Sequence, residues 1–308
     1  MPSNIHGLLL IHKPSGITSH DVINQVRRRL GTKEVGHAGT LDPLAEGLMV
    51  LLLGEATKMS SYVLEKNKQY EVTLKLGIET DTLDITGKVL REHLDMNFDD
   101  QKVIEKAKAL QGDFTWEVPI YSATKVAGRK LYEHARSGGD VSIEIPRKPM
   151  SFWEVEPMKV QEEKSSYQFR LNCSKGSFIR SWVQQLGWSL GGGAVMTELT
   201  RTYSAPYQLK NAIDLNQLST TEGLNNSNAF IPMLAALPEF KSIRVSGASE
   251  ALIRNGQISH ELRRRLIIHF NPEKDTGVKI LSQRPEELLA LVGLEPGKGF
   301  VVRRVFRY

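Results

Sequence analysis

The sequence is organised around one glycine-rich segment, Gly36-His37-Ala38-Gly39-Thr40-Leu41-Asp42-Pro43-Leu44-Ala45-Glu46-Gly47. Glycine permits backbone conformations that are closed to other residues. Pro43 fixes its own φ and favours an extended conformation at Asp42. A carboxylate held in such a loop, close to His37 and Thr40, is a candidate catalytic group. A plain turn that begins at Asp-Pro is the simpler interpretation, so the rest of the chain has to decide between them.

The residues that flank this loop predict a rigid core. Leu48 to Leu53 is an unbroken apolar run that ends at Gly54, typical of a strand buried on both faces. A short apolar strand over 7–12 and a helix that ends at Leu30 precede the loop. Because catalytic residues are commonly carried on loops at the edge of rigid elements, the position of Asp42 favours a functional role.

Composition places the chain among globular proteins. It has 308 residues, of which 40% are hydrophobic and 24% charged, and its length predicts about two domains. No segment has the roughly 18–20 apolar residues of a membrane span, and the first residues do not resemble a signal peptide. The single cysteine, Cys173, excludes an internal disulfide and a cysteine-based zinc site. We therefore expect a cytoplasmic protein that does not enter a membrane.

The positive charge is concentrated at the end of the chain. Residues 239–308 hold 13 Lys and Arg against 8 Asp and Glu, an excess equal to the net charge of +5 of the whole sequence. This asymmetry indicates either an appended module that meets a polyanion or a mildly basic solvated surface. We expect a domain over 1–238 and a small β-rich module over 239–308, with strands at 242–246, 266–269, 288–293 and 300–306.

Two further segments contain candidate site residues. Tyr70 begins the apolar face of an alternating strand over 68–78, where it is either a core tyrosine or an aromatic platform for a base. Asp81 and Asp84 follow in a polar turn. They fall short of a calcium loop, so we expect Asp side chains that bond nearby backbone.

Arg180 is the candidate partner of Asp42. It lies in the first turn of a helix that we expect Ser177 to cap, where the helix dipole disfavours a cation. An anion close to Arg180 would explain this misfit, although an ordinary surface arginine is the alternative. No catalytic triad and no tight histidine spacing for a metal is present, so Asp42 is the best candidate carboxylate.

Several segments together resemble the TruB family of tRNA pseudouridine synthases. They arrive in the family's order over residues from about 8 to 205, and the block around Asp42 is the most specific. The segments are Lys13-Pro14, the Gly36–Gly47 loop, Leu53–Lys58, Lys68–Tyr70, Leu76-Gly77 with Thr80–Asp84, Ile120–Lys125, Cys173–Arg180 and Leu199–Thr202.

The resemblance implies a fold, a reaction and a partner. The fold is an α/β (α+β) pseudouridine-synthase catalytic domain with a large, mostly antiparallel sheet, an RNA-binding insertion around 119–150 and a PUA-like C-terminal module. The reaction converts uridine to pseudouridine at position 55 in the T loop of tRNA, without guide RNA. The partner is the tRNA T arm, no cofactor or metal is implied, and we expect a monomer.

The resemblance also assigns roles by motif position. Asp42 matches the catalytic aspartate, Tyr70 the tyrosine that stacks on the target base, and Arg180 the partner of Asp42. Leu199 would close the pocket, and His37 would enter the RNA stack that the base has left. Phe178 departs from the tyrosine that well-known members carry, which puts any role of that hydroxyl in doubt. The supporting residues are Lys13, Gly39 and Asp84.

Three alternatives stay open at this point. One is a guide-RNA-dependent enzyme of the dyskerin type, and another is a non-catalytic tRNA-binding or tRNA-folding protein. The third is a carboxylate hydrolase that acts on small substrates, which would not bind RNA in a salt-dependent manner. The sequence does not decide whether Asp42 first attacks ribose, attacks the base or promotes an elimination.

Overall fold

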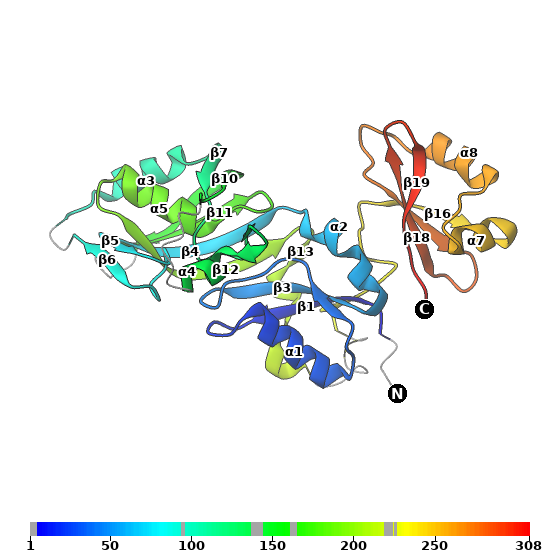
Figure 1. Cartoon of the computed structure of the whole chain (residues 1–308), viewed down its shortest axis with the longest axis horizontal. Helices are drawn as coiled ribbons and strands as arrows, with labels where there is room; N and C mark the ends of the chain where they lie inside the picture. Colours follow the sequence, from blue (N-terminus) through cyan, green and yellow to red (C-terminus); the bar gives the residue numbers. More distant parts are fainter. Residues whose placement is uncertain (1–4, 94–95, 137–143, 161–164, 219–223, 225–226) are drawn as a thin grey trace.

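A mixed α/β architecture surrounds one large sheet. The computed structural model describes residues 5–93, 96–136, 144–160, 165–218, 224 and 227–308. In this part of the chain the large sheet has eleven strands, eight of which follow the order β14-β1-β3-β12-β4-β11-β10-β7. A smaller sheet of order β16-β17-β18-β19 stands at the other end of the molecule (Figure 1). The expected fold class, a mixed α/β protein with a large sheet, is confirmed.

The large sheet is mostly antiparallel. Among its described strands, only β1 with β14 and β12 with β3 pair in parallel. All of Leu48 to Leu53 is buried, as the apolar run predicts. The strands are β1 Gly7–Lys13, β2 Val35–His37, β3 Glu46–Leu53, β4 Lys68–Leu76, β7 Gly112–Glu117, β10 Arg147–Val160, β11 Ser166–Cys173, β12 Ala194–Ser204, β13 Tyr207–Gln208, β14 Ile213–Asp214 and β15 Phe230–Pro232.

Helices and short hairpins complete the larger part of the molecule. Helix α1 begins with a capping box between Thr18 and Asp21 and ends at Gly31, which adopts the left-handed conformation. Helices α3 and α5 contact each other, and α5 also contacts β4 and β12. The elements are α1 Ser19–Leu30, η1 Gly54–Met59, α2 Ser60–Leu64, β5 Ile78–Thr80, β6 Val89–Glu92, α3 Asp100–Ala109, β8 Lys125–Val126, β9 Arg129–Lys130, α4 Leu131–Arg136, α5 Ile179–Ser189, η2 Leu209–Asn211 and η3 Leu215–Gln217.

The C-terminal part contains a helix where a strand was expected. Residues 266–269 belong to α8, because Leu262 and Leu266 lie one helical turn apart and are both fully buried. Ser259 caps this helix by accepting a hydrogen bond from the backbone N–H of Leu262. The prediction of a strand there was wrong. The elements are β16 Lys241–Val245, α7 Gly247–Arg254, α8 His260–His269, β17 Val278–Ser282, β18 Leu288–Glu295 and β19 Gly299–Val305.

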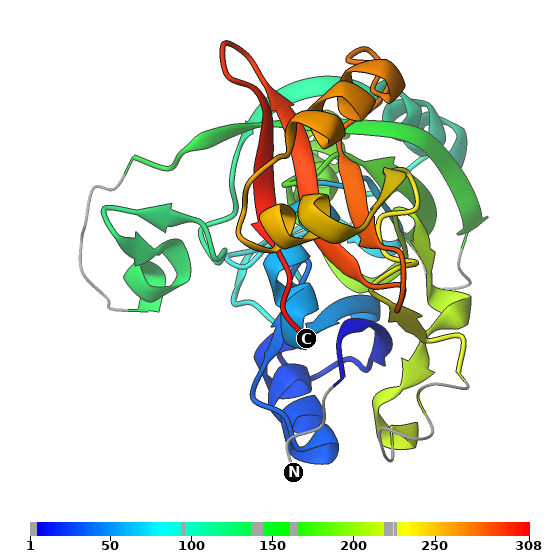
Figure 2. The same ribbon diagram turned by 90° about the vertical axis from the view of Figure 1, so that its right-hand side faces the viewer.

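Segments η1 and α2 contact the C-terminal part, which lies in front of the large sheet in Figure 2. The Arg304 Nε donates to the Lys58 carbonyl at 3.2 Å, and the backbone N–H of Arg307 donates to Glu55 at 2.7 Å. The rings of Tyr62 and Phe240 meet edge to face at 5.7 Å. Apolar residues of both parts belong to one core, with Phe240, Leu281, Leu288, Leu291 and Phe306 contributed by the C-terminal side. None of the described helices combines the length and hydropathy needed to cross a bilayer.

Candidate active site

The Asp42 carboxylate forms an ion pair with Arg180. Asp42 lies in the loop between β2 and β3, Arg180 is the second residue of α5, and the two charged groups are 2.8 Å apart. The Arg180 side chain is 5% exposed, whereas the Asp42 side chain is 41% exposed. The carboxylate is therefore held by a charge-assisted bond from the protein side and is open on the other. Such a group can act as a nucleophile or as a base.

The Arg180 guanidinium is fixed by two backbone carbonyls. It donates to the Thr82 carbonyl and to the Tyr121 carbonyl, each at 2.9 Å. The turn that carries Thr82 is held by Asp84, whose Oδ1 accepts from the Thr82 hydroxyl at 2.9 Å and from the Thr86 N–H at 3.0 Å. This is the turn chemistry expected of Asp84. It connects Asp84 to Asp42 through Arg180.

Lys13 bonds to the backbone of the Asp42 loop. Its ammonium is completely buried and donates to the carbonyls of Ala45 at 2.6 Å, Pro14 at 3.0 Å and Pro43 at 3.3 Å. Burial lowers the pKa of Lys13 to about 8, opposed by the charge of Asp42. Since two of the three acceptors belong to the loop, Lys13 fixes the backbone directly after Asp42.

Arg201 holds the other side of the same loop. It lies on β12, is 1% exposed, and donates to the carbonyls of Leu48 at 2.7 Å, Thr40 at 3.2 Å and Gly39 at 3.3 Å. Arg201 lies in the Leu199–Thr202 segment that resembles the family, but it was not predicted as a site residue. Its spacing of two from Leu199 was the available signal, because alternate residues of a strand share one face.

Two glycines of the loop are required by geometry. Gly39 and Gly47 have φ values of +114° and +100°, which side chains of L-residues rarely adopt. A Cβ atom at Gly47 would lie 2.5 Å from the Arg201 carbonyl oxygen. The start of β3 therefore lies against the Arg201 backbone of β12 with no room for a side chain at Gly47. The Ser19 hydroxyl adds a further tie, since it donates to the Leu41 carbonyl at 2.9 Å.

Tyr70 and Leu199 lie on the neighbouring strands β4 and β12. Tyr70 is directly opposite Arg201 in the strand register, and Leu199 is opposite Val72. Both selected residues are buried, at 8% and 6% exposure. Burial raises the pKa of the Tyr70 hydroxyl, an effect that the charge of Arg201 opposes. The register therefore brings Tyr70 and Leu199 to the same region as Arg201 and the Asp42 loop.

His37 and Phe178 lie at the ends of elements that border the site. His37 ends β2, and its Nδ1 accepts from the backbone N–H of Gly39 at 3.2 Å. Burial, helped by the charge of Arg201, lowers the pKa of His37, so its imidazole is neutral near pH 7. Phe178, half-buried, is the N-cap residue of α5. The expected cap at Ser177 was wrong, because its hydroxyl instead bonds the Ser174 hydroxyl at 2.9 Å.

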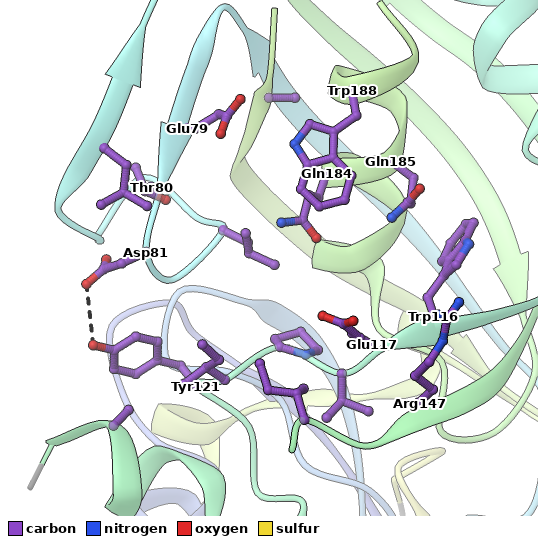
Figure 3. A pocket seen from close by; sticks show the side chains of 18 residues that line it. Glu79, Thr80, Asp81, Trp116, Glu117, Tyr121, Arg147, Gln184, Gln185 and Trp188 are labelled. Atoms are coloured by element: carbon purple, nitrogen blue, oxygen red, sulfur yellow. Dashed lines mark hydrogen bonds between the residues drawn. The ribbon is translucent and has the colours of Figure 1, made fainter. Parts of the chain in front are cut away.

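A cavity of about 770 Å³ lies beside this site rather than on it. Figure 3 shows Gln184 and Trp188 of α5 facing Glu117 across it, with Tyr121 at one side. Asp42, Tyr70 and Arg180 are absent from its lining. Asp42 is the candidate reactive group, because a paired carboxylate in a fixed loop can act chemically and an open cavity alone cannot. Among the described residues, no cluster of three or more His, Cys, Asp or Glu could hold a metal ion.

Comparison with known proteins identifies the family. The family described as TruB family pseudouridylate synthase (N terminal domain) matches residues 27–179. The tRNA pseudouridine synthase B of Bdellovibrio bacteriovorus is 48% identical over 307 residues, which cover 99% of this chain and 98% of that protein. The chain belongs to the TruB family. The tRNA pseudouridine synthase B of Geobacillus thermodenitrificans is 34% identical to this TruB-family chain, over 98% of it and 99% of the relative.

Solved structures share the fold of this TruB-family protein. An H/ACA RNP bound to a substrate RNA containing 2'-deoxyuridine includes a chain that superposes with a TM-score of 0.67 at 21% identity, over 98% of this chain and 85% of that one. A Cbf5-Nop10-Gar1 complex gives a TM-score of 0.66 at 22% identity, over 98% and 84%. At such identities the likeness concerns the fold alone.

Proposed function

We propose that this TruB-family protein is a stand-alone tRNA pseudouridine synthase that isomerises the uridine at position 55 of the T loop. The observation that carries the proposal is the Asp42–Arg180 pair at 2.8 Å, with its carboxylate 41% exposed, in a chain of this family. A half-open, paired carboxylate fits nucleophilic or basic chemistry on a base that has been turned out of an RNA stack.

The reaction rearranges one nucleotide without a net change of atoms. The bond between N1 of uracil and C1′ of ribose breaks, and a bond between C5 and C1′ forms. C5 then loses its proton, and N1 gains one. Asp42 acts first on ribose, on the base, or as the base of an elimination, and each route uses an ionised carboxylate. Arg180 holds the carboxylate in place, because its guanidinium lies 2.8 Å from it and forms a charge-assisted bond.

The side chains around Asp42 suit a flipped base. Tyr70 offers a ring on which uracil can stack, and Leu199 gives the pocket an apolar wall. His37, with its neutral imidazole, would fill the gap in the RNA stack. Phe178 retains the aromatic face but has no hydroxyl, so no hydrogen bond is assigned to it.

Two basic regions would bind the rest of the tRNA. The insertion around 119–150 carries Lys130 with its ammonium 5.3 Å from the centre of the Tyr132 ring, a basic and aromatic pair. The module over 239–308 holds the excess of positive charge and would act as a PUA-like RNA-binding unit. We place the reaction in the cytoplasm and expect a monomer to carry it out.

Tritium at C5 of uridine provides the test. The purified protein should release tritium from labelled tRNA, and a single pseudouridine should be found at position 55 by primer extension after carbodiimide treatment. Asp42→Asn keeps the size of the side chain and removes the charge, so it should abolish release. Full release by Asp42→Asn would reject the assignment of Asp42.

A second measurement separates the stand-alone enzyme from its alternatives. A bare T-arm stem-loop should be modified by the protein without any added RNA. A guide-dependent enzyme would leave this substrate unchanged, and a non-catalytic tRNA-binding protein would bind it without releasing tritium.

A further inference from the structure

Arg201 lies between the strand that carries Tyr70 and the segment that carries Asp42. In the register of the large sheet its Cα is opposite Tyr70 of β4 on one side and opposite Gly47 of β3 on the other. Gly47 ends the loop that carries Asp42. A single residue of β12 is therefore adjacent both to the strand of the stacking tyrosine and to the loop of the carboxylate.

The Arg201 side chain bonds to the backbone both before and after Asp42. Its guanidinium donates to Gly39 and Thr40, which precede Asp42, and to Leu48, which follows it, at 2.7–3.3 Å. The side chain is 1% exposed, so it is not available to bind RNA. These bonds restrain the loop in a manner that a contact at one end could not achieve.

Arg201 acts electrostatically on a group of titratable side chains from several strands. Its positive charge lowers the pKa of each side chain, although burial shifts each pKa more than Arg201 does. Asp42 acts in the opposite direction on two of the group, Lys13 and Tyr70. The group consists of Lys13 on β1, His37 on β2, Lys68 and Tyr70 on β4 and Cys173 on β11.

We propose that Arg201 is the positioning residue of this enzyme: it fixes the Asp42 loop against the strand of Tyr70 and supplies a permanent positive charge beneath the active site. The inference rests on the proposed function, since its readout is uridine isomerisation. Arginine suits the role because its fork of five donors reaches several carbonyls at once and because it stays protonated. Lysine would keep the charge at neutral pH and would bond fewer of the carbonyls.

Three variants test the proposal: Arg201→Gln, Arg201→Lys and Lys68→Met. For Arg201→Gln we expect kcat to fall by at least about 30-fold, while KM and the Kd for tRNA stay within about threefold, because the loss concerns the reacting geometry. The alkaline limb of its pH–rate profile should move to higher pH, since removal of the cation raises the pKa of Lys13, which is about 8. Arg201→Lys should have an intermediate kcat at pH 7, with KM and the Kd for tRNA as in the wild type.

Lys68→Met is the matched control. Lys68 is also a buried cation bonded to carbonyls, but its acceptors are Leu64 at 3.1 Å and Lys66 at 2.6 Å, outside the Asp42 loop. Its kcat should stay within about threefold of the wild type. If Arg201→Gln does not fold, Arg201→Lys alone decides, because its kcat at pH 7 must lie below that of the wild type while KM and the Kd for tRNA stay unchanged.

The failure of this proposal differs from failure of the proposed function. An inactive wild type would reject the function. An active wild type whose Arg201→Gln variant keeps kcat, or loses tRNA affinity in proportion to kcat, would reject the positioning role. An Arg201→Lys variant with the kcat of the wild type at pH 7 would do the same, and so would one that loses tRNA affinity in proportion to kcat.

Discussion

The surroundings of the Asp42–Arg180 pair and the C-terminal helix α8 place positive charge in different ways. Around the Asp42 loop the cations of Lys13, Arg180 and Arg201 are at most 5% exposed, and each donates to backbone carbonyls. On α8 the side chains of Arg263 and Arg264 are exposed, and within the described part of the chain neither forms an ion pair. The first arrangement fixes geometry, and the second leaves charge free for a polyanion.

The physical cost explains this division. A buried cation loses its hydration, at a cost of several kcal/mol, and is stable only with well-placed acceptors. Such a group acts over short distances and is little affected by salt. Exposed guanidinium groups cost little, act over roughly a Debye length of about 8–10 Å, and are weakened by salt. Substitutions in the two regions should therefore differ in size and in salt dependence.

The largest effect is expected for Arg180→Leu. This change removes the partner of Asp42 and leaves the Thr82 and Tyr121 carbonyls without their donor. We expect kcat to fall by at least about 100-fold, equivalent to about 2.7 kcal/mol. Single-turnover tritium release at saturating enzyme would measure it.

Arg170→Leu is the control for Arg180. Arg170 also pairs with a carboxylate at 2.9 Å, that of Glu71, but its side chain is 40% exposed. Exposed pairs contribute about 0–1 kcal/mol, so kcat should change less than about fivefold. Equal losses in the two variants would contradict the distinction between buried and exposed cations.

Gly47→Ala should give the next largest effect, on stability. The new Cβ would meet the Arg201 carbonyl oxygen at 2.5 Å and its nitrogen at 2.8 Å, and the φ of +100° adds strain. We expect the free energy of unfolding to fall by about 3 kcal/mol. Urea denaturation would measure the change.

Gly176→Ala separates strain from the clash. Its φ of +75° is also unfavourable, but nothing lies within 4 Å of the new Cβ. The expected loss is about 1 kcal/mol. A loss as large as that of Gly47→Ala would show that the close approach to Arg201 contributes nothing.

A smaller effect is expected from the pH dependence of Lys13. Its pKa is about 8 in the folded protein against 10.5 as a free group, so between these values the unfolded chain binds a proton that the folded chain does not. Stability must therefore rise with pH in this window. From pH 8 to 9.5 Lys13 should contribute about 1–2 kcal/mol to the free energy of unfolding.

Lys13→Met and Lys68→Met test this slope together. The pKa of Lys68 is also lowered to about 8 by burial, so each single variant should lose about half of the rise and the double variant nearly all of it. Denaturation curves at several pH values provide the measurement. A slope as steep in the double variant as in the wild type would show that the rise comes from other groups, such as Lys279, whose pKa burial also lowers.

The local structure around Asp42 could be predicted from the sequence better than the distant residues that hold it. The Asp42 loop, the buried strand after it and the turn around Asp84 carry local patterns, because glycine, proline and aspartate have strong backbone preferences. Arg201 has no such pattern. Its role depends on pairing with β3 and β4, whose residues are more than a hundred positions away, and a single strand does not reveal its neighbours.

The errors in the C-terminal part have a related cause. The run at 266–269 is apolar and short, so its composition fits a strand or a helix equally well. The helix is decided by Leu262 and Leu266, which reach the core together, while Ile267 and Ile268 are 64% and 73% exposed. Strand β17 was missed, although all of Val278–Ser282 is buried in the structure.

The smallest effect should come from the exposed arginines of α8. Arg263→Gln and Arg264→Gln are each expected to weaken tRNA binding by about 0.5–1 kcal/mol and to reduce the salt slope of log K by about 0.7–0.9 per lost phosphate contact. Arg254→Gln is the control, because Arg254 is already paired with Glu250 at 2.9 Å and Glu287 at 3.1 Å. Filter binding at several salt concentrations would measure the slopes.

Point variants are preferable to truncation, since the C-terminal part shares the core of the large sheet. The double variant that combines Arg263→Gln and Arg264→Gln decides whether α8 contacts phosphate. An unchanged salt slope in this variant would show that it does not, and the excess charge of the module would then be a solvated surface.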